Sequence, residues 1–269
     1  MTPTPLSGWE VLHRELDAWA ALGRRATLWW RDDDACAASA ALARLLDLAA
    51  THRVPVAIAA IPARVEQSLG DAIAGCREAT IVQHGYAHVN HATAGERAAE
   101  LGSHRPLPAR VAELARGCER LASTFGDRFD PVLVPPWNRI ADDLVAVLAS
   151  AGLAGLSCFG ARTRSAAEGI AQVNTHVDPI AWRRGRVFAG TQACIERVVE
   201  HLRARRTGEV DADEPTGILT HHLTFADDAF TFVDALLRET SSHPAAAWLD
   251  ARSAFDTTGH LRPISMNRV

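Results

Sequence analysis

Three histidines stand close together near the middle of the first half of the chain, at His84, His88 and His91. Offsets of four and three residues bring side chains to one face of a helical turn, within reach of a single ion. Histidines in a loop are often only solvated, but this group directly follows an apolar strand pattern. We therefore interpret His84 and His88 as metal ligands, and His91 as a third ligand or, preferably, as a residue that supports the other two.

A run of three acids, Asp32, Asp33 and Asp34, follows the apolar segment Ala26–Trp30. An exposed acidic turn would be the simplest origin of such a run. Adjacent carboxylates at close range, however, cannot all stay ionised without a cation. A divalent ion removes that repulsion, so that one carboxylate can ligate it while its neighbour accepts a proton as a general base.

His221 and His222 come directly after another apolar run, Ile218–Thr220. Because side chains alternate along a strand, one of these histidines should face the site and the other should face away. Imidazole titrates near neutral pH, which suits the general acid that a hydrolase needs.

Two other segments combine polar and aromatic side chains after predicted strands. One presents Trp137 and Arg139 after a Pro-Pro turn, and the other contains Asp178 and Trp182. Each segment, taken alone, is equally compatible with an ordinary turn between a strand and a helix.

The composition excludes several kinds of chemistry. The chain has 269 residues, and all 28 basic side chains are arginine. Without lysine, a Schiff base, a pyridoxal phosphate site and a P-loop are impossible. The net charge of −4 argues against a nucleic-acid partner, which would require a basic excess on one face.

The cysteines and the N-terminal residues indicate in which cellular compartment we expect the protein. The five cysteines include no Cys-x-x-Cys pair, and Met1–Pro5 has neither a basic start nor an apolar run. No stretch reaches the roughly 18 apolar residues of a membrane span. We expect a cytoplasmic, reduced protein without a membrane partner, and the oligomeric state stays open.

Apolar strand patterns alternate with helical patterns along the chain. The predicted strands are Ala26–Trp30, Val54–Ile61, Thr80–Gln83, Val132–Val134, Ala154–Cys158, Ile170–Asn174 and Gly217–Thr220. The predicted helices include Trp9–Leu22, Ala38–Ala50, Asp142–Ala151, Cys194–Arg205 and Asp228–Thr240. This alternation indicates βα units around a parallel sheet, in one domain over residues 1–269 whose N-terminal helix, within residues 1–25, packs on the barrel. Parallel α/β folds place active sites at the carboxyl ends of strands, so the polar segments should meet there.

In this order the segments resemble the motifs of the polysaccharide deacetylase family of carbohydrate esterases, over Leu28 to Leu223. The family's Thr-Phe-Asp-Asp-Gly motif is similar to Arg31–Ala35, which implies that Asp33 is the catalytic base and Asp34 a metal ligand. A register one residue earlier would assign Asp32 and Asp33 instead, and the sequence leaves both open. The His-(Ser/Thr)-x-x-His motif is similar to His84–His88, which implies two metal ligands, although Gly85 replaces the hydroxyl residue.

The remaining motifs match less completely. Arg-Pro-Pro-(Tyr/Trp)-Gly resembles Val134–Asn138, but valine replaces the arginine that would orient the base, so Arg31 or Arg139 must take that role. The aspartate and tryptophan of the fourth motif look like Asp178 and Trp182. Leu-x-His-Asp is similar to Leu219–His222, which implies that His221 is the catalytic acid.

The resemblance implies a distorted (β/α)7 barrel and a metal-dependent hydrolase that removes an N-acyl group, preferably N-acetyl, from an amino sugar or similar small amide. Asp34, His84 and His88 would hold a divalent ion, preferably Zn²⁺. The substrate would be a small molecule or short oligosaccharide, and an indole could stack on a sugar face. Eight further side chains would contact substrate or support these groups: Arg31, Asp32, His91, Trp137, Arg139, Asp178, Trp182 and His222.

Three alternatives belong to other classes. A non-hydrolytic carbohydrate-binding protein on the same barrel would carry a degenerate metal site. A two-histidine, one-carboxylate Fe(II) oxygenase has the same ligand types, but such enzymes usually present His-x-(Asp/Glu) on an antiparallel fold. An amidohydrolase that depends on a carbamylated lysine is excluded by the absence of lysine.

Overall fold

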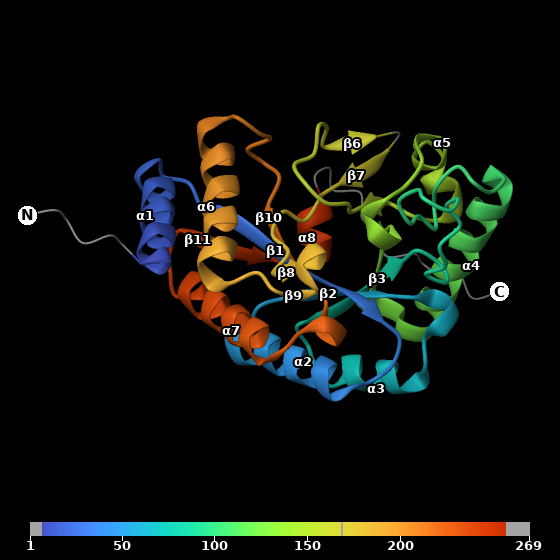
Figure 1. Cartoon of the computed structure of the whole chain (residues 1–269), viewed down its shortest axis with the longest axis horizontal. Coiled ribbons are helices and arrows are strands. Elements are labelled where there is room, and N and C mark those ends of the chain that lie inside the picture. The colour runs from blue at the N-terminus through green and yellow to red at the C-terminus, as the bar shows by residue number, and fades with distance from the viewer. Residues whose placement is uncertain (1–6, 168, 257–269) are drawn as a thin grey trace, which may run out of the picture.

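The computed structural model describes residues 7–167 and 169–256 (Figure 1). The expectations drawn from Met1–Pro5 concern residues outside this part of the chain. The strands are β1 (Ala26–Ala35), β2 (Val56–Ala60), β3 (Ala79–His84), β4 (Phe129–Val134), β5 (Gly155–Leu156), β6 (Ala166–Ala167), β7 (Ile170–Gln172), β8 (Ile180–Ala181), β9 (Val187–Phe188), β10 (Thr216–Thr220) and β11 (Ala246–Leu249).

Helices cover the outside of the sheet (Figure 1). The α-helices are α1 (Gly8–Ala21), α2 (Ala40–His52), α3 (Gln67–Ala74), α4 (Leu107–Phe125), α5 (Asp142–Val145), α6 (Thr191–Thr207), α7 (Asp227–Ser241) and α8 (Ala251–Phe255). Short 3₁₀ turns include η3 (Pro136–Asn138), η4 (Leu148–Ala151) and η6 (His222–Thr224). Within the described ranges, no helix is both long and apolar enough to cross a membrane.

Seven parallel strands form the main path of the sheet, in the order β10-β1-β2-β3-β4-β5-β7. An eighth parallel strand, β11, pairs with β1 off this path, and β6 adds an antiparallel edge to β7. The chain after β7 then turns back toward β10, where Val177 forms a parallel bridge with Ile218. This contact curls the sheet toward closure. The fold is therefore the distorted (β/α)7 barrel that the sequence predicts.

Alternation along β1 separates the two sides of the sheet. Trp29 lies in an inner cluster with small residues such as Ala57 and Ala59, and its ring meets the edge of Phe255 from α8 at 5.6 Å. Trp30 lies instead in the larger cluster between the sheet and the helices. Arg31 and Asp33 have the same parity as Trp29 and therefore continue the inner face.

Two predicted boundaries are wrong. The strand predicted to end at Trp30 continues to Ala35 because β10 pairs with it as far as Asp32 and β2 pairs with it beyond Arg31. The predicted helix Asp142–Ala151 divides into α5 and η4, since Val147 leaves the helical region at φ −122°. The sequence also missed β11, which pairs with the first half of β1.

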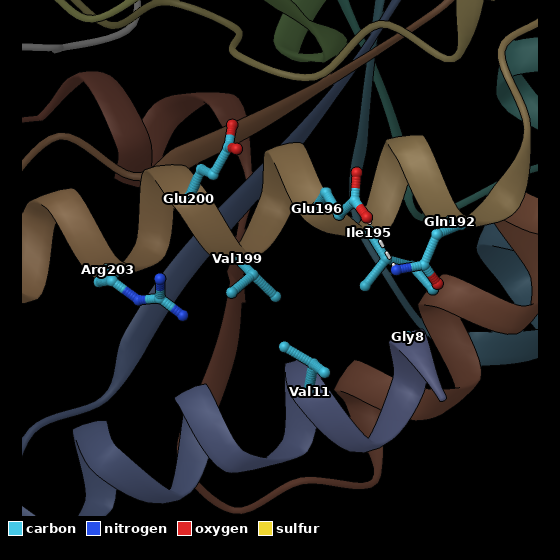
Figure 2. A pocket seen from close by; sticks show the side chains of 8 residues that line it. All are labelled: Gly8, Val11, Gln192, Ile195, Glu196, Val199, Glu200 and Arg203. Carbon is cyan, nitrogen blue, oxygen red and sulfur yellow. Dashed lines mark hydrogen bonds between the residues drawn. The ribbon is translucent and has the colours of Figure 1, made fainter. Parts of the chain in front are cut away.

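The N-terminal helix α1 begins at Gly8, after an N-cap formed by Ser7. The Ser7 hydroxyl accepts from the Glu10 N–H at 3.3 Å, and the Glu10 carboxylate accepts from the Ser7 N–H at 2.7 Å. Helix α1 lies beside α6 (Figure 1), and Trp9 stacks on Phe232 of α7 at 6.1 Å. Figure 2 shows the shallow pocket between α1 and α6, lined by side chains that include Val11, Val199 and Arg203.

Candidate functional site

Asp34, His84 and His88 come together at the carboxyl edge of the sheet. Asp34 lies at the end of β1, His84 is the last residue of β3, and His88 lies in the loop that follows. The Nε2 atoms of both histidines are 3.2 Å from Asp34 Oδ1, and one potential ligand atom from each residue lies within 4.8 Å of the others. Two nitrogens and one oxygen at this spacing are a suitable donor set for a divalent transition metal.

A hydrogen bond to the backbone fixes the orientation of the His84 ring. Its Nδ1 lies 3.0 Å from the carbonyl oxygen of Val134, an acceptor, so Nδ1 carries a proton and Nε2 is the ring nitrogen that faces Asp34. A hydrogen bond of this kind is typical of metal-ligating histidines. The backbone contributes as well, because Asp34 and His88 both have positive φ, at 77° and 57°. Such non-glycine conformations concentrate at functional sites.

The charges in this group are strongly coupled. Burial by itself would raise the pKa of Asp34, but hydrogen bonds from His84 and His88 outweigh it and hold the pKa far below its usual value. Burial likewise disfavours a charged His84, while the negative charges of Asp33 and Asp34 raise its pKa. The site thus contains a carboxylate that attracts positive charge, and a bound cation would supply that charge as well as protons do.

Asp33 does not belong to this group and is held by Arg31. The buried guanidinium of Arg31 donates from Nε to Asp33 Oδ1 at 2.8 Å and from Nη2 to Oδ2 at 3.0 Å. It also donates to the Ser157 hydroxyl at 2.7 Å and to Asn138 Oδ1 at 2.7 Å. Of the two arginines considered from the sequence, Arg139 instead donates to the Ala98 carbonyl.

Asp32 faces away from Asp34, His84 and His88 and toward the helix layer. Its carboxylate accepts from the Thr220 hydroxyl at 2.7 Å and from the His222 N–H at 3.0 Å, and it also contacts the His222 ring. Burial opposes protonation of His222, but the Asp32 charge raises the pKa of that imidazole. The alternative register would need Asp33 beside the two histidines, whereas in the structure Asp34 occupies that place.

His221 lies directly after β10, at the carboxyl edge of the sheet, and is 8% exposed. The edge of its ring meets Trp182 at 4.8 Å, and the Trp182 indole donates to Asp178 Oδ2 at 2.6 Å. Burial raises the pKa of Asp178, and the charge of His221 partly offsets that effect. The buried Nδ1 of His221 has no hydrogen-bond partner among the described residues.

The Pro-Pro turn brings one aromatic ring to the histidines. The Trp137 ring lies 4.4 Å from that of His88, and both Trp137 and Asn138 have positive φ. His91 lies outside the metal group, and its backbone N–H donates to the Ala99 carbonyl. Most of the residues singled out from the sequence thus lie near one another at this edge of the sheet. His91 and Arg139 do not contact Asp34, His84 or His88.

Glu100 is a supporting residue that the sequence analysis missed. This buried carboxylate accepts from the N–H groups of Tyr86 and Ala87, at 3.1 and 2.7 Å, and so holds the loop between His84 and His88. It occupies the space that a side chain at Gly85 would fill. No short motif links residues 13 and 14 positions apart in this way, although an acid in an apolar surrounding is a signal that it is paired.

A second group of potential metal ligands lies near the amino end of β10, away from His221. It is formed by His176, His201 and Glu214. Burial lowers the pKa of His176, and it lowers the pKa of His201 to about 2, so both rings are neutral. His176 Nδ1 accepts from the Gly217 N–H at 2.9 Å, which leaves the ring proton on Nε2, facing Glu214 at 3.3 Å. His176 in this tautomer therefore has no free lone pair for a metal, although its Nε2 and that of His201 form no hydrogen bond with the described residues.

The chain matches no protein-family model and no curated protein. Its structure is similar to several solved ones. A protein of Mycobacterium smegmatis assigned as a polysaccharide deacetylase has a TM-score of 0.63 and 15% identity, over 85% of this chain and 87% of that one. A family 4 carbohydrate esterase of Streptomyces lividans, in complex with acetate, has a TM-score of 0.53 and 14% identity, over 83% and 91%.

A third similar structure contains a metal. The family 4 acetyl xylan esterase of Clostridium thermocellum, in complex with a cobalt ion, has a TM-score of 0.54 and 13% identity, over 85% of this chain and 90% of that one. At these identities the comparisons concern the fold. They show that this chain has the barrel fold of the polysaccharide deacetylases, the family that its motifs resemble.

Proposed function

We propose that this protein is a metal-dependent hydrolase of the polysaccharide deacetylase family that removes an N-acyl group, typically N-acetyl, from an amino sugar or a similar small amide. The observation that carries the proposal is the joint placement of Asp34, His84 and His88 beside a separate carboxylate, Asp33, that Arg31 holds by two hydrogen bonds. A ligand set next to an independent base is what metal-assisted hydrolysis needs.

The donor set fits a divalent ion. Asp34 Oδ1 lies 3.2 Å from both Nε2 atoms, and the hydrogen bond from His84 Nδ1 to Val134 leaves Nε2 as the nitrogen that would ligate the ion. The cobalt ion in the similar Clostridium thermocellum esterase supports the same conclusion. When bound, zinc or a related ion would polarise the amide carbonyl and make a water molecule more acidic.

Asp33 is suited to accept the proton of the attacking water. Each carboxylate oxygen can accept two hydrogen bonds, and Arg31 uses one position on each oxygen. One lone pair on each oxygen therefore stays available, while the guanidinium fixes the direction of the carboxylate. The roles are divided: Asp34 ligates, and Asp33 moves a proton.

His221 is suited to protonate the departing amine. Its ring is buried against Trp182, and its Nδ1 has no partner in the described part of the chain, so the imidazole is free to donate at the mouth. Trp182 packs against His221, and Trp137 packs against His88. Their ring faces offer flat apolar surfaces for a sugar ring.

The test combines metal placement with turnover. Crystals of the zinc-loaded protein, measured at the zinc absorption edge, should place one ion between Asp34, His84 and His88, and the protein should release acetate from N-acetylglucosamine oligomers. Asp33→Asn should keep the ion and lose turnover. An ion elsewhere, or turnover retained in Asp33→Asn, would refute the assigned roles, and sugar binding without hydrolysis would instead favour a carbohydrate-binding barrel.

A further inference from the structure

The β8–β9 hairpin has a composition that the deacetylase reaction does not explain. Between its two short strands the chain reads Trp182-Arg183-Arg184-Gly185-Arg186. Trp182 connects this hairpin to the site, since its indole donates to Asp178 and its ring contacts His221. The hairpin follows the segment that closes the barrel beside β10. The hairpin arginines therefore lie near the carboxyl edge of the sheet, where the candidate site is.

The three arginines of the hairpin carry unneutralised charge. All three are exposed, and none of them forms an ion pair or a side-chain hydrogen bond with any residue that the structure describes. The nearby carboxylate, Asp178, is buried and already accepts from Trp182 and the Ile180 N–H. On a chain with a net charge of −4, this is a local excess of positive charge at one side of the mouth.

One of these charges lies over the Trp182 ring, which contacts His221. Arg186 has φ 60°, a conformation that non-glycine residues rarely adopt, directly after Gly185 at φ 92°. Its guanidinium carbon lies 6.0 Å from the centre of the Trp182 ring, on the residue that contacts His221. A fourth arginine, Arg197 on α6, donates to the Asp178 carbonyl at 2.9 Å and adds positive charge behind the hairpin.

We propose that Arg183, Arg184 and Arg186 bind an anionic group, a phosphate or a carboxylate, carried by the substrate beside its acylated amine. Guanidinium groups bind both anions through paired N–H donors, and an exposed cluster also attracts a charged substrate from solution. The inference rests on the proposed function, because it makes the substrate of that same site an acidic amide rather than a neutral sugar.

The experiment compares three probes that differ in charge: N-acetylglucosamine, its 6-phosphate, and N-acetylmuramic acid, which carries a carboxylate. The test variant combines Arg183→Gln, Arg184→Gln and Arg186→Gln. The matched control combines Arg77→Gln, Arg203→Gln and Arg238→Gln, which remove the same charge from exposed side chains elsewhere. Acetate release gives kcat and KM, and calorimetry on Asp33→Asn protein gives the binding affinity without turnover.

Wild-type and control proteins should prefer an anionic probe about tenfold over the neutral one, with the difference in KM and decreasing with added salt. The hairpin variant should lose that preference while its activity on the neutral probe stays. Equal affinity for all three probes, or a preference that survives in the hairpin variant, would overturn the inference while leaving the proposed function intact. Charge-dependent binding without any hydrolysis would support the inference and refute the proposed function.

Discussion

Arg31 and Asp33 stand two residues apart on the same face of β1, and they form a two-point ion pair inside the barrel. Val134, the last residue of β4, stands where the family motif has an arginine, so the group that holds Asp33, the proposed base, comes from β1 itself. Asn138, from the turn after β4, still contributes by accepting from Arg31 at 2.7 Å. The support of Asp33 is thus divided between β1 and that turn.

Replacing Arg31 by methionine should therefore affect both stability and catalysis. The change leaves the Asp33 carboxylate buried without its partner, which costs about 3–5 kcal/mol of unfolding free energy for pairs of this kind. We expect kcat to fall and the bound metal to stay, because Arg31 does not contact Asp34. Denaturant unfolding, acetate release and metal content measure the three effects.

Arg139→Met is the control for this change. Its guanidinium donates only to the Ala98 carbonyl in the described structure, so the expected loss is about 1 kcal/mol. Equal losses of stability and kcat for Arg31→Met and Arg139→Met would contradict the view that Arg31, and not Arg139, holds Asp33.

Gly85→Ser should destabilise the protein, although it restores the hydroxyl residue of the family motif. Gly85 has φ 54°, and an added Cβ would fall onto the Glu100 carboxylate and within 2.6 Å of Pro136 Cδ. Displacing Glu100 frees the N–H groups of Tyr86 and Ala87 in the loop before His88. We expect a loss of about 3 kcal/mol or more from the strained backbone and the lost hydrogen bonds, together with weaker zinc binding.

Gly23→Ser provides the matched comparison. Gly23 has nearly the same φ, 65°, but no atom lies within 4 Å of its added Cβ. Only the backbone strain should appear there, about 1–2 kcal/mol, with unchanged zinc affinity. Thermal unfolding and zinc titration of both variants separate the two contributions, and identical behaviour would show that Glu100 does not matter.

The sequence predicted the barrel because its signal is repetitive. Each buried strand, such as Val56–Ala60, is a short apolar run followed by a helix, and errors at one boundary do not change the others. The proximity of Asp34, His84 and His88 was predictable for a related reason, since the carboxyl ends of β1 and β3 must lie at the same edge of a parallel sheet. Elements with weak local patterns were missed, as the short β8–β9 hairpin and β11 illustrate.

Finer features of the site depend on contacts that have no local pattern. The register of the acids could not be read from spacing, because the positive φ of Asp34 turns its side chain toward the histidines against simple alternation. Whether Arg31 or Arg139 holds Asp33 depends on the path of the turn after β4. This turn contains Asn138, which lies 107 residues after Arg31. Glu100 reaches its partners only through the folded loop.

Zinc titration should give one bound ion per chain, although the described residues contain two groups of suitable donors. A ligand at a hundred times its dissociation constant stabilises a protein by about 2.7 kcal/mol. We expect this gain in the wild type and its loss in His88→Ala. His201→Ala, in the second group, should keep the gain, because the proton on His176 Nε2 already excludes a metal there. A second bound ion that His201→Ala removes would contradict this assignment.

The buried pair of Asp32 and His222 should make stability depend on pH in a definite direction. Despite the opposing effect of burial, the Asp32 charge raises the pKa of His222 in the folded protein. The unfolded chain releases that proton near pH 6.5, so the pair stabilises fully below that pH and loses its contribution as pH rises through the folded pKa. Each unit of elevation corresponds to about 1.4 kcal/mol.

Because other groups titrate in the same range, the measured quantity is the difference in unfolding free energy between wild type and His222→Gln at pH 6 and pH 9. The wild-type advantage should be larger at pH 6 and should shrink toward pH 9. Metal-free protein serves for both measurements, so that metal affinity does not add its own pH dependence. An advantage that grows with pH would mean that the folded protein holds His222 neutral, and the Thr220 hydroxyl and backbone N–H would then be the main partners of Asp32.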